Sequence, residues 1–185
     1  RKSLAQSGIY SYSVLQYERT QSGRFRKPSS LRRQSLACFG THDTPTIRGF
    51  FEGRDIEWWH KLGWINESST RDAKSQRDAE CDDMTSIVNS DPPPLDGNDA
   101  GSVDRSVHYA LANSPATMVS VQLDDLEGRV ESQNLPGTID EHPNWRRRHL
   151  TPIENLTHLT ELRDLGKLMD KCGRNSGPAR KRDNQ

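Results

Sequence analysis

The chain has 185 residues, and its 26 basic residues (Lys and Arg) equal its 26 acidic residues (Asp and Glu) in number. This balance excludes the global positive field that would concentrate nucleic acid or an anionic membrane, and it is compatible with neutral substrates. Only 31% of the residues are hydrophobic and 6% aromatic, which predicts a thin core for a self-contained domain of this length.

The first predicted elements are two strands, each followed by a polar segment. Residues 9–17 are rich in β-branched and aromatic types and predict a strand, with a polar loop over residues 18–30. Residues 35–40, SLACFG, predict a strand buried on both faces, as in a parallel sheet. The cluster THDTPT follows directly, and apolar residues at helical spacing predict one helix over residues 46–63.

The middle of the chain is more polar. Residues 66–89 are heavily charged and predict a surface-exposed helix, and residues 90–102, SDPPPLDGNDAGS, predict a linker or long loop. A further helix is predicted over residues 103–115, ending at Pro115. Residues 117–123, TMVSVQL, predict a third strand, which is again followed at once by acidic residues.

The C-terminal region combines a long loop with a leucine-rich segment. The loop covers residues 132–149, leucines at three- and four-residue steps predict a helix over residues 153–172, and the polar tail 173–185 is predicted to be disordered. Strands that alternate with helices predict the α/β fold class. Polar clusters directly after the strands are typical of the carboxyl face of a barrel, where active sites lie.

The segment LACFGTHDTPTIRGFFEGRDIEWW, residues 36–59, resembles the amylomaltase family of 4-α-glucanotransferases, glycoside hydrolase family 77. In that family a barrel strand carries a His-Asp pair into the active site. The resemblance implies that Asp43 stabilises an oxocarbenium-like transition state and that His42 binds the same sugar. Taken alone, the motif is also explained by helix capping through Asp43 and an ordinary loop position for His42, because isolated His-Asp pairs are common.

A second segment, residues 113–148, resembles the family's last barrel strand and the loop after it. It contains NLPGT followed closely by EHPNWRRR. Asn134 lies where the family places an amide that contacts the substrate, although turn formation with Pro136 and Gly137 also explains this residue. Since both segments occur in the family's order, together they make the resemblance specific.

Several other residues near these segments have two explanations. We expect Gln122 and Asp125 to support the loop after the third strand through hydrogen bonds. Trp58, Trp59 and Trp64 are typical of residues that pack against a barrel at helical spacing, and stacking on glucose rings is the alternative.

Trp145 and the three arginines after it also have two explanations. An aromatic residue beside consecutive arginines is typical of nucleic-acid binding. Acidic residues lie just upstream at Asp140 and Glu141, and no further basic stripe is present. We therefore favour ion pairs within the loop, and a nucleic-acid-binding module stays as the weaker alternative.

The cysteines and the hydropathy pattern bear on location. Cys38, Cys81 and Cys172 are odd in number and widely spaced, unlike the close pairs of a zinc site or a disulfide framework. No apolar run approaches the roughly 18 residues that span a bilayer, and no segment resembles a signal peptide. We expect a cytoplasmic protein that does not bind membranes.

Over residues 1–172, the resemblance implies the C-terminal portion of a (β/α)8 barrel with about three of its strands. It implies retaining transfer of α-1,4-glucan segments between maltooligosaccharides, without a cofactor or metal, because carboxylates carry out the chemistry. The family's nucleophile and acid/base carboxylates belong to segments upstream of Arg1, so we expect this chain to be inactive alone. A non-catalytic glucan-binding remnant is the alternative function, and the sequence indicates no oligomeric state.

Overall fold

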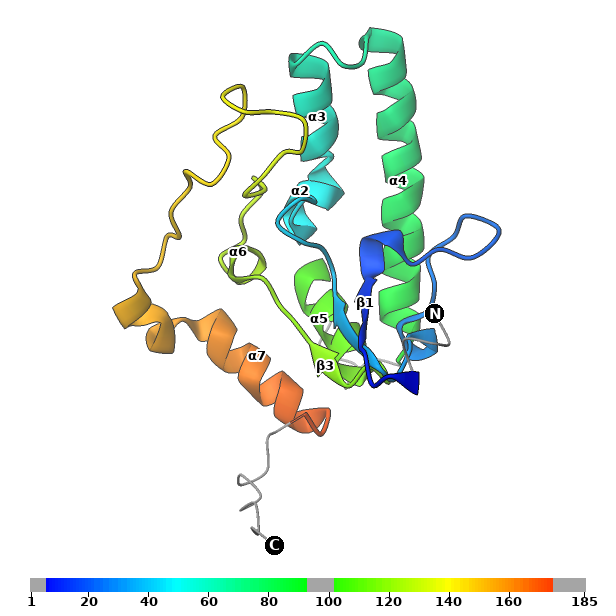
Figure 1. The fold of residues 1–185 in the computed structure, drawn as a ribbon, viewed down its shortest axis with the longest axis vertical. Coiled ribbons are helices and arrows are strands. Elements are labelled where there is room, and N and C mark those ends of the chain that lie inside the picture. Colours follow the sequence, from blue (N-terminus) through cyan, green and yellow to red (C-terminus); the bar gives the residue numbers. More distant parts are fainter. Residues whose placement is uncertain (1–5, 93–101, 175–185) are drawn as a thin grey trace, which may run out of the picture.

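The computed structural model describes residues 6–92 and 102–174 and contains a small parallel sheet flanked by helices (Figure 1). The strands are β1 (Ser11–Val14), β2 (Ser35–Cys38) and β3 (Met118–Val119), in the order β1-β2-β3. The register pairs Val14 with Cys38 and Ala37 with Val119. The predicted α/β class with three parallel strands is therefore confirmed.

All three strands are shorter than predicted, and β2 ends at Cys38 rather than at residue 40. β1 ends at Val14 because Leu15–Tyr17 closes into the 3-10 helix η1. β3 has two residues, and after Ser120 donates its backbone N–H to the Ala37 carbonyl at 2.9 Å, the chain turns into α6 (Leu123–Leu126). The predicted strands have the right positions but the wrong lengths.

The longer helices pack beside the sheet and against one another. They are α2 (Ile47–Glu52), α3 (Arg54–Lys61), α4 (Glu67–Ser90), α5 (Val103–Asn113) and α7 (Thr160–Lys171), with 3-10 helices η2 (Pro28–Ser30) and η3 (Ile153–His158). The prediction of one continuous helix over residues 46–63 is wrong. Gly53 ends α2 and begins α3 at a φ of 70°, a left-handed conformation that glycine adopts without steric cost.

Helix α4 is mostly exposed, as predicted for residues 66–89, but it also buries a charged residue. Arg77 is only 9% exposed, and its guanidinium donates to both carboxylate oxygens of Asp55 at 2.9 Å and to the Phe50 carbonyl at 2.8 Å. The apolar residues that α4 buries are Met84, Ile87 and Val88. One narrow stripe is enough to anchor the helix, although charged residues dominate its composition.

The core lies between one face of the sheet and helices α2, α4 and α5. Its buried members include Leu15, Ala37, Phe39, Ile47, Phe50, Met84, Val107 and Leu111. On the opposite face, the alternation of side chains along a strand places Tyr12, Leu36 and Met118 in one row at matching register. Tyr12 is 56% exposed and Met118 43%, so helices cover only one face of this sheet.

The predicted helix over residues 153–172 is interrupted. Leu159 has extended backbone angles, and it separates η3 from α7. Helix α7 lies beside α5 (Figure 1) and buries Leu168. The helix predicted over residues 103–115 is confirmed, since α5 ends at Asn113, two residues before Pro115.

Two predictions concern segments that the structure covers only in part. Most of the predicted linker over residues 90–102 lies in residues 93–101, and most of the predicted tail lies in residues 175–185. Both of these ranges are outside the described residues.

Candidate active site

The loop that follows β2, residues 39–46, is held by its own threonines; we call it the β2 loop. Thr44 Oγ1 accepts a hydrogen bond from the Thr41 N–H at 2.7 Å and donates to the Thr41 carbonyl at 3.0 Å. Gln16 from η1 donates to the Pro45 carbonyl at 2.9 Å. A Cβ atom at Gly40 would clash with Thr44 Oγ1, so the tight packing of this turn requires glycine.

The β2 loop also resolves the capping question for Asp43. Thr46 is the N-cap of α2, and its side chain accepts a hydrogen bond from the Gly49 N–H at 2.9 Å. Helix capping by Asp43 is therefore wrong. The Asp43 side chain is 45% exposed and that of His42 is 57% exposed, so both are accessible to a ligand.

The three candidate residues from the sequence meet at one point, although Asn134 is 91 positions from Asp43. Asn134 Nδ2 donates to Asp43 Oδ1 at 2.6 Å, and the Asn134 backbone N–H donates to the His42 carbonyl at 3.0 Å. His42 Nε2 lies 3.4 Å from Asp43 Oδ2. A carboxylate, an imidazole and an amide thus form one accessible polar cluster beyond the carboxyl ends of parallel strands; we call it the Asp43 cluster.

Trp145 contacts this cluster, although the sequence analysis did not assign it to the site. Its ring packs against that of His42 in a tilted arrangement, with centroids 5.0 Å apart and 48° between the planes. The residue has a φ of 59° and its backbone N–H donates to the Gln133 carbonyl at 2.9 Å. Only the unusual backbone conformation brings the indole to His42, and the sequence contained no indication of that conformation.

Residues 127–152 form the long loop that carries Asn134, and Asn144 organises its centre. Asn144 Oδ1 accepts the Leu135 N–H at 2.9 Å, while Nδ2 donates to the Thr138 hydroxyl at 2.8 Å. His142 is fully buried, and its Nδ1 lies 2.6 Å from Asn144 Oδ1. These bonds give an otherwise irregular segment a defined shape, and that shape fixes the position of Asn134.

The long loop is tied to α3 through Glu131. This carboxylate accepts hydrogen bonds from Arg54 Nε at 2.8 Å and Trp58 Nε1 at 2.9 Å, and it pairs with Arg147 at 3.3 Å. Burial alone would raise the pKa of Glu131, but the hydrogen bonds from Arg54 and Trp58 and the charge of Arg147 hold it below its usual value. The ion pairs keep Glu131 ionised and anchor the loop.

The ion pairs predicted for the arginines after Trp145 are confirmed in part. Arg146 pairs with Asp140 at 2.7 Å. The prediction is wrong for Glu141, whose carboxylate accepts the backbone N–H groups of Ile139 and Asp140 at 2.9 and 3.1 Å.

Gln122 and Asp125 do not support the long loop, so that prediction is wrong. Asp125 Oδ1 instead accepts the N–H of Ile47 at 2.8 Å, which fixes the start of α2 directly after the β2 loop. Gln122 is the N-cap residue of α6 and makes no side-chain capping bond. The long loop is held by the neighbouring Asp124, which accepts a hydrogen bond from Gln133 at 2.8 Å.

A cleft of about 520 Å³ opens beside Asp43, with Tyr17, Trp59 and Pro136 in its lining. The packing role predicted for the tryptophans is confirmed for Trp58, which is 8% exposed. It is wrong for Trp64, which is 48% exposed. Trp59 faces the cleft.

Residues 6–92 and 102–174 contain neither a membrane-spanning helix nor a cluster of metal ligands. No helix there has the length and apolar character needed to cross a membrane. In the same ranges, no group of three His, Cys, Asp or Glu side chains is arranged to hold a metal ion.

The fold and the Asp43 cluster define an α/β protein with an accessible polar site at the carboxyl ends of parallel strands. Residues 1–152 match the family model described as 4-alpha-glucanotransferase, glycoside hydrolase family 77. The match covers most of the chain, and the chain belongs to this family.

Relatives and solved structures agree with the family match. The chain is 34% identical over 154 residues to the 4-alpha-glucanotransferase of Haemophilus influenzae, an alignment that covers 78% of this chain and 22% of the relative. The crystal structure of amylomaltase from Corynebacterium glutamicum superposes with a TM-score of 0.72 at 25% identity, over 91% of this chain and 26% of that one. An amylomaltase from Streptococcus agalactiae, in complex with acarbose, has the same fold at a TM-score of 0.56 and 16% identity, over 91% of this chain and 29% of that one. The chain thus spans about a quarter of the length of the proteins that it matches.

Proposed function

We propose that this chain is the C-terminal part of a (β/α)8 barrel in a retaining 4-α-glucanotransferase. In this proposal Asp43 stabilises the transition state, and His42 and Asn134 bind the sugar at the cleavage site. The observation that carries the proposal is the hydrogen bond from Asn134 to Asp43 at 2.6 Å. It joins the two segments that resemble the family's active-site loops, at the strand ends where barrel enzymes place their catalytic groups.

The geometry suits a supporting role in glycosyl transfer. Retaining cleavage of an α-1,4 bond needs a nucleophilic carboxylate and a carboxylic acid about 5–5.5 Å apart, with an oxocarbenium-like transition state between them. Asn134 fixes Asp43 Oδ1, so the carboxylate does not have to reorganise when positive charge develops on the sugar. His42 and Trp145 then form one wall beside that carboxylate.

The open face of the sheet supports an incomplete barrel. Tyr12, Leu36 and Met118 form an apolar row on the face that helices do not cover, where the interior of a complete barrel would pack. The nucleophile and the acid/base group would come from the upstream strands. We therefore expect the 185-residue chain alone to release no glucose from maltotriose. A cytoplasmic location and independence of cofactors stay predictions.

A chimera tests the proposed function. Residues 1–152 of this chain replace the matching segment of the Haemophilus influenzae relative, and glucose release from maltotriose is measured. The chimera is expected to be active, and Asp43→Asn is expected to lower its turnover by about 10²–10³-fold, the usual loss when one preorganised electrostatic contact to a transition state is removed. Asp72→Asn, an exposed change of the same kind on α4, serves as the control.

Two results would contradict the proposal. One is an active chimera in which Asp43→Asn and Asp72→Asn have equal turnover. The other is an inactive chimera combined with maltotriose binding by the 185-residue chain, which would favour the glucan-binding remnant. A nucleic-acid-binding module is the alternative with the weakest support. The ion pairs of Arg146 and Arg147 leave less positive charge to bind a nucleic acid.

A further inference from the structure

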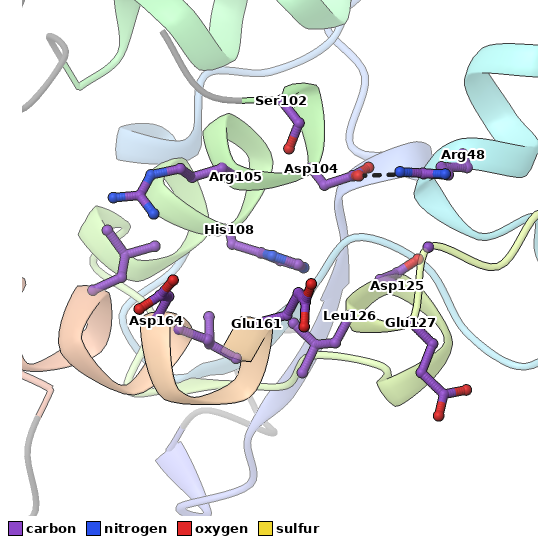
Figure 2. A pocket seen from close by; sticks show the side chains of 13 residues that line it. Arg48, Ser102, Asp104, Arg105, His108, Asp125, Leu126, Glu127, Glu161 and Asp164 are labelled. Atoms are coloured by element: carbon purple, nitrogen blue, oxygen red, sulfur yellow. Dashed lines mark ion pairs between the residues drawn. The ribbon is translucent and has the colours of Figure 1, made fainter. Parts of the chain in front are cut away.

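A second pocket, of about 300 Å³, lies between α5, α6 and α7, outside the Asp43 cluster (Figure 2). Its lining contains none of the residues of the Asp43 cluster. The described residues that line it are Arg48, Ser102, Asp104, Arg105, His108, Asp125, Leu126, Glu127, Gly128, Glu161, Asp164, Leu165 and Leu168.

His108 projects from α5 into the middle of this pocket (Figure 2). The residue is only 5% exposed, and among the described residues its Nε2 atom has no hydrogen-bond partner. Burial lowers the pKa of His108 to about 4, so the imidazole is neutral near pH 7. An unsatisfied buried nitrogen is costly, and a ligand that bonds to it would remove this cost.

Asp104 offers a second unsatisfied atom. Its Oδ2 lies 3.7 Å from Arg48 Nε, while its Oδ1 is buried without a partner in the described part of the chain. Since a carboxylate oxygen only accepts hydrogen bonds, the missing partner must be a donor. Neutral His108 presents either a lone pair or an N–H at Nε2, depending on its tautomer, and a donor ligand selects the lone pair.

The charges around the pocket favour a cation. Its described lining contains five carboxyl groups, from Asp104, Asp125, Glu127, Glu161 and Asp164, and two guanidinium groups, so acidic groups outnumber basic ones. Burial raises the pKa of Asp125 to about 7, so this group is only partly ionised near pH 7, and Asp164 pairs with Lys167 at 2.8 Å. Glu127 is already satisfied, since it accepts the backbone N–H groups of Leu150 and Thr151 at 3.0 and 2.8 Å. The other carboxylates surround His108 from α5, α6 and α7 (Figure 2).

The remaining lining is aliphatic. Leu126, Leu165 and Leu168 form an apolar wall, and the described lining contains no Trp, Tyr or Phe on which a sugar ring would stack. The ligand should therefore combine a strong donor with a short hydrocarbon. We propose that this pocket binds a small primary alkylammonium ion, with the ammonium group between Asp104 and His108 and the alkyl chain against the leucines.

Calorimetric titration of the 185-residue chain with 1,4-diaminobutane tests the proposal, and 1,4-butanediol is the matched neutral ligand. The diamine should bind at one site, at least about tenfold more tightly than the diol, because hydrogen bonds to charged groups are the stronger ones. Glu161→Gln on the exposed side of α7 should weaken diamine binding. Glu154→Gln, the same change on an exposed residue of η3 outside the pocket, should leave binding unchanged.

A second variant, at Asp104, tests the proposed contact with the ammonium group directly. Asp104→Asn replaces the unsatisfied acceptor with an amide and should weaken diamine binding more than Glu161→Gln does. The proposal is overturned if the diamine does not bind, if the diol binds equally well, or if Glu154→Gln weakens binding as much as Glu161→Gln. Equal weakening by those two variants would indicate general attraction to acidic residues.

Discussion

The Asp43 cluster and the pocket around His108 differ in the exposure and the hydrogen bonding of their polar side chains. In the Asp43 cluster, the side chains of His42 and Asp43 are exposed, and the half-buried Asn134 donates to Asp43 at 2.6 Å. In the pocket, His108 and Asp104 each bury an atom without a partner in the described structure. Exposed groups retain contact with water and cost little to organise, whereas buried groups lose their hydration and change the stability of the fold.

The largest expected effect comes from Asp125 in the pocket. Burial raises the pKa of Asp125 to about 7, against the effect of the Ile47 N–H and with a contribution from the charge of Asp104. Between about pH 4 and 7 the native state therefore holds a proton that the unfolded state has released, so stability falls as pH rises. Over this window the loss is roughly 4 kcal/mol, at about 1.4 kcal/mol per pKa unit.

Asp125→Asn should remove this loss of stability between pH 4 and 7, while the amide oxygen still accepts the hydrogen bond from the Ile47 N–H. Urea unfolding at pH 4, 5.5 and 7 measures it, and Asp140→Asn, which changes an exposed carboxylate, is the control. A variant with the same pH profile as the unmodified chain would show that Asp125 is not the group that takes up the proton.

His108 should act in the opposite direction. Its pKa of about 4 in the native state lies below the usual 6.5, so between these values the unfolded state takes up a proton that the native state does not. Stability contributed by neutral His108 therefore rises with pH across this window, by roughly 3 kcal/mol. In the unmodified chain the two contributions nearly cancel below pH 6.5.

His108→Gln should expose the uncompensated effect of Asp125, so that stability falls from pH 4 to 7 in urea unfolding. The double variant with Asp125→Asn should have a nearly flat profile. If the stability of His108→Gln instead rises from pH 4 to 7, the assignment of opposite contributions to Asp125 and His108 is wrong.

A smaller effect is expected in the long loop that carries the Asp43 cluster. Asn144→Ala removes the acceptor for Leu135 and the donor to Thr138, and it should lower the free energy of unfolding by about 1–3 kcal/mol. Urea unfolding measures the loss. Asn155→Ala, at an exposed position in η3, should change little, and equal losses in both variants would contradict the role of Asn144.

The smallest effect is expected at Asp43 itself. Because its side chain is 45% exposed, Asp43→Asn should change the free energy of unfolding by less than about 0.5 kcal/mol. The same substitution has the large effect on turnover expected in the chimera. A stability loss of several kcal/mol would mean that Asp43 has a structural role, and the contrast between the two regions would then fail.

The sequence predicted the parts of the fold and site that depend on local pattern. The strand SLACFG and the polar loop after it were identifiable from the pattern of adjacent residues. The three residues of the Asp43 cluster were identifiable through the resemblance of their two segments to the amylomaltase family. The burial of Arg77 on α4 was not, because it depends on an ion pair with Asp55, which lies in another helix. Composition alone suggested exposure.

Other features depend on contacts between distant segments. Trp145 reaches His42 only through a backbone conformation with positive φ. Asp125 accepts a hydrogen bond from the N–H of Ile47, 78 positions away. The residues that line the pocket around His108 lie between Arg48 and Leu168 in the sequence. Periodicity and motifs describe residues that are close along the chain, so they do not predict such tertiary contacts.

The contact between the Trp145 and His42 rings gives the Asp43 cluster a spectroscopic reporter. Trp145 is 63% exposed and its ring is in contact with the imidazole, so a sugar that enters beside His42 must change the surroundings of an indole. Its fluorescence would therefore register occupancy without any chemical step. The difference between the chain and a Trp145→Phe variant isolates this emission from that of the other tryptophans, so ligand binding can be measured without an activity assay.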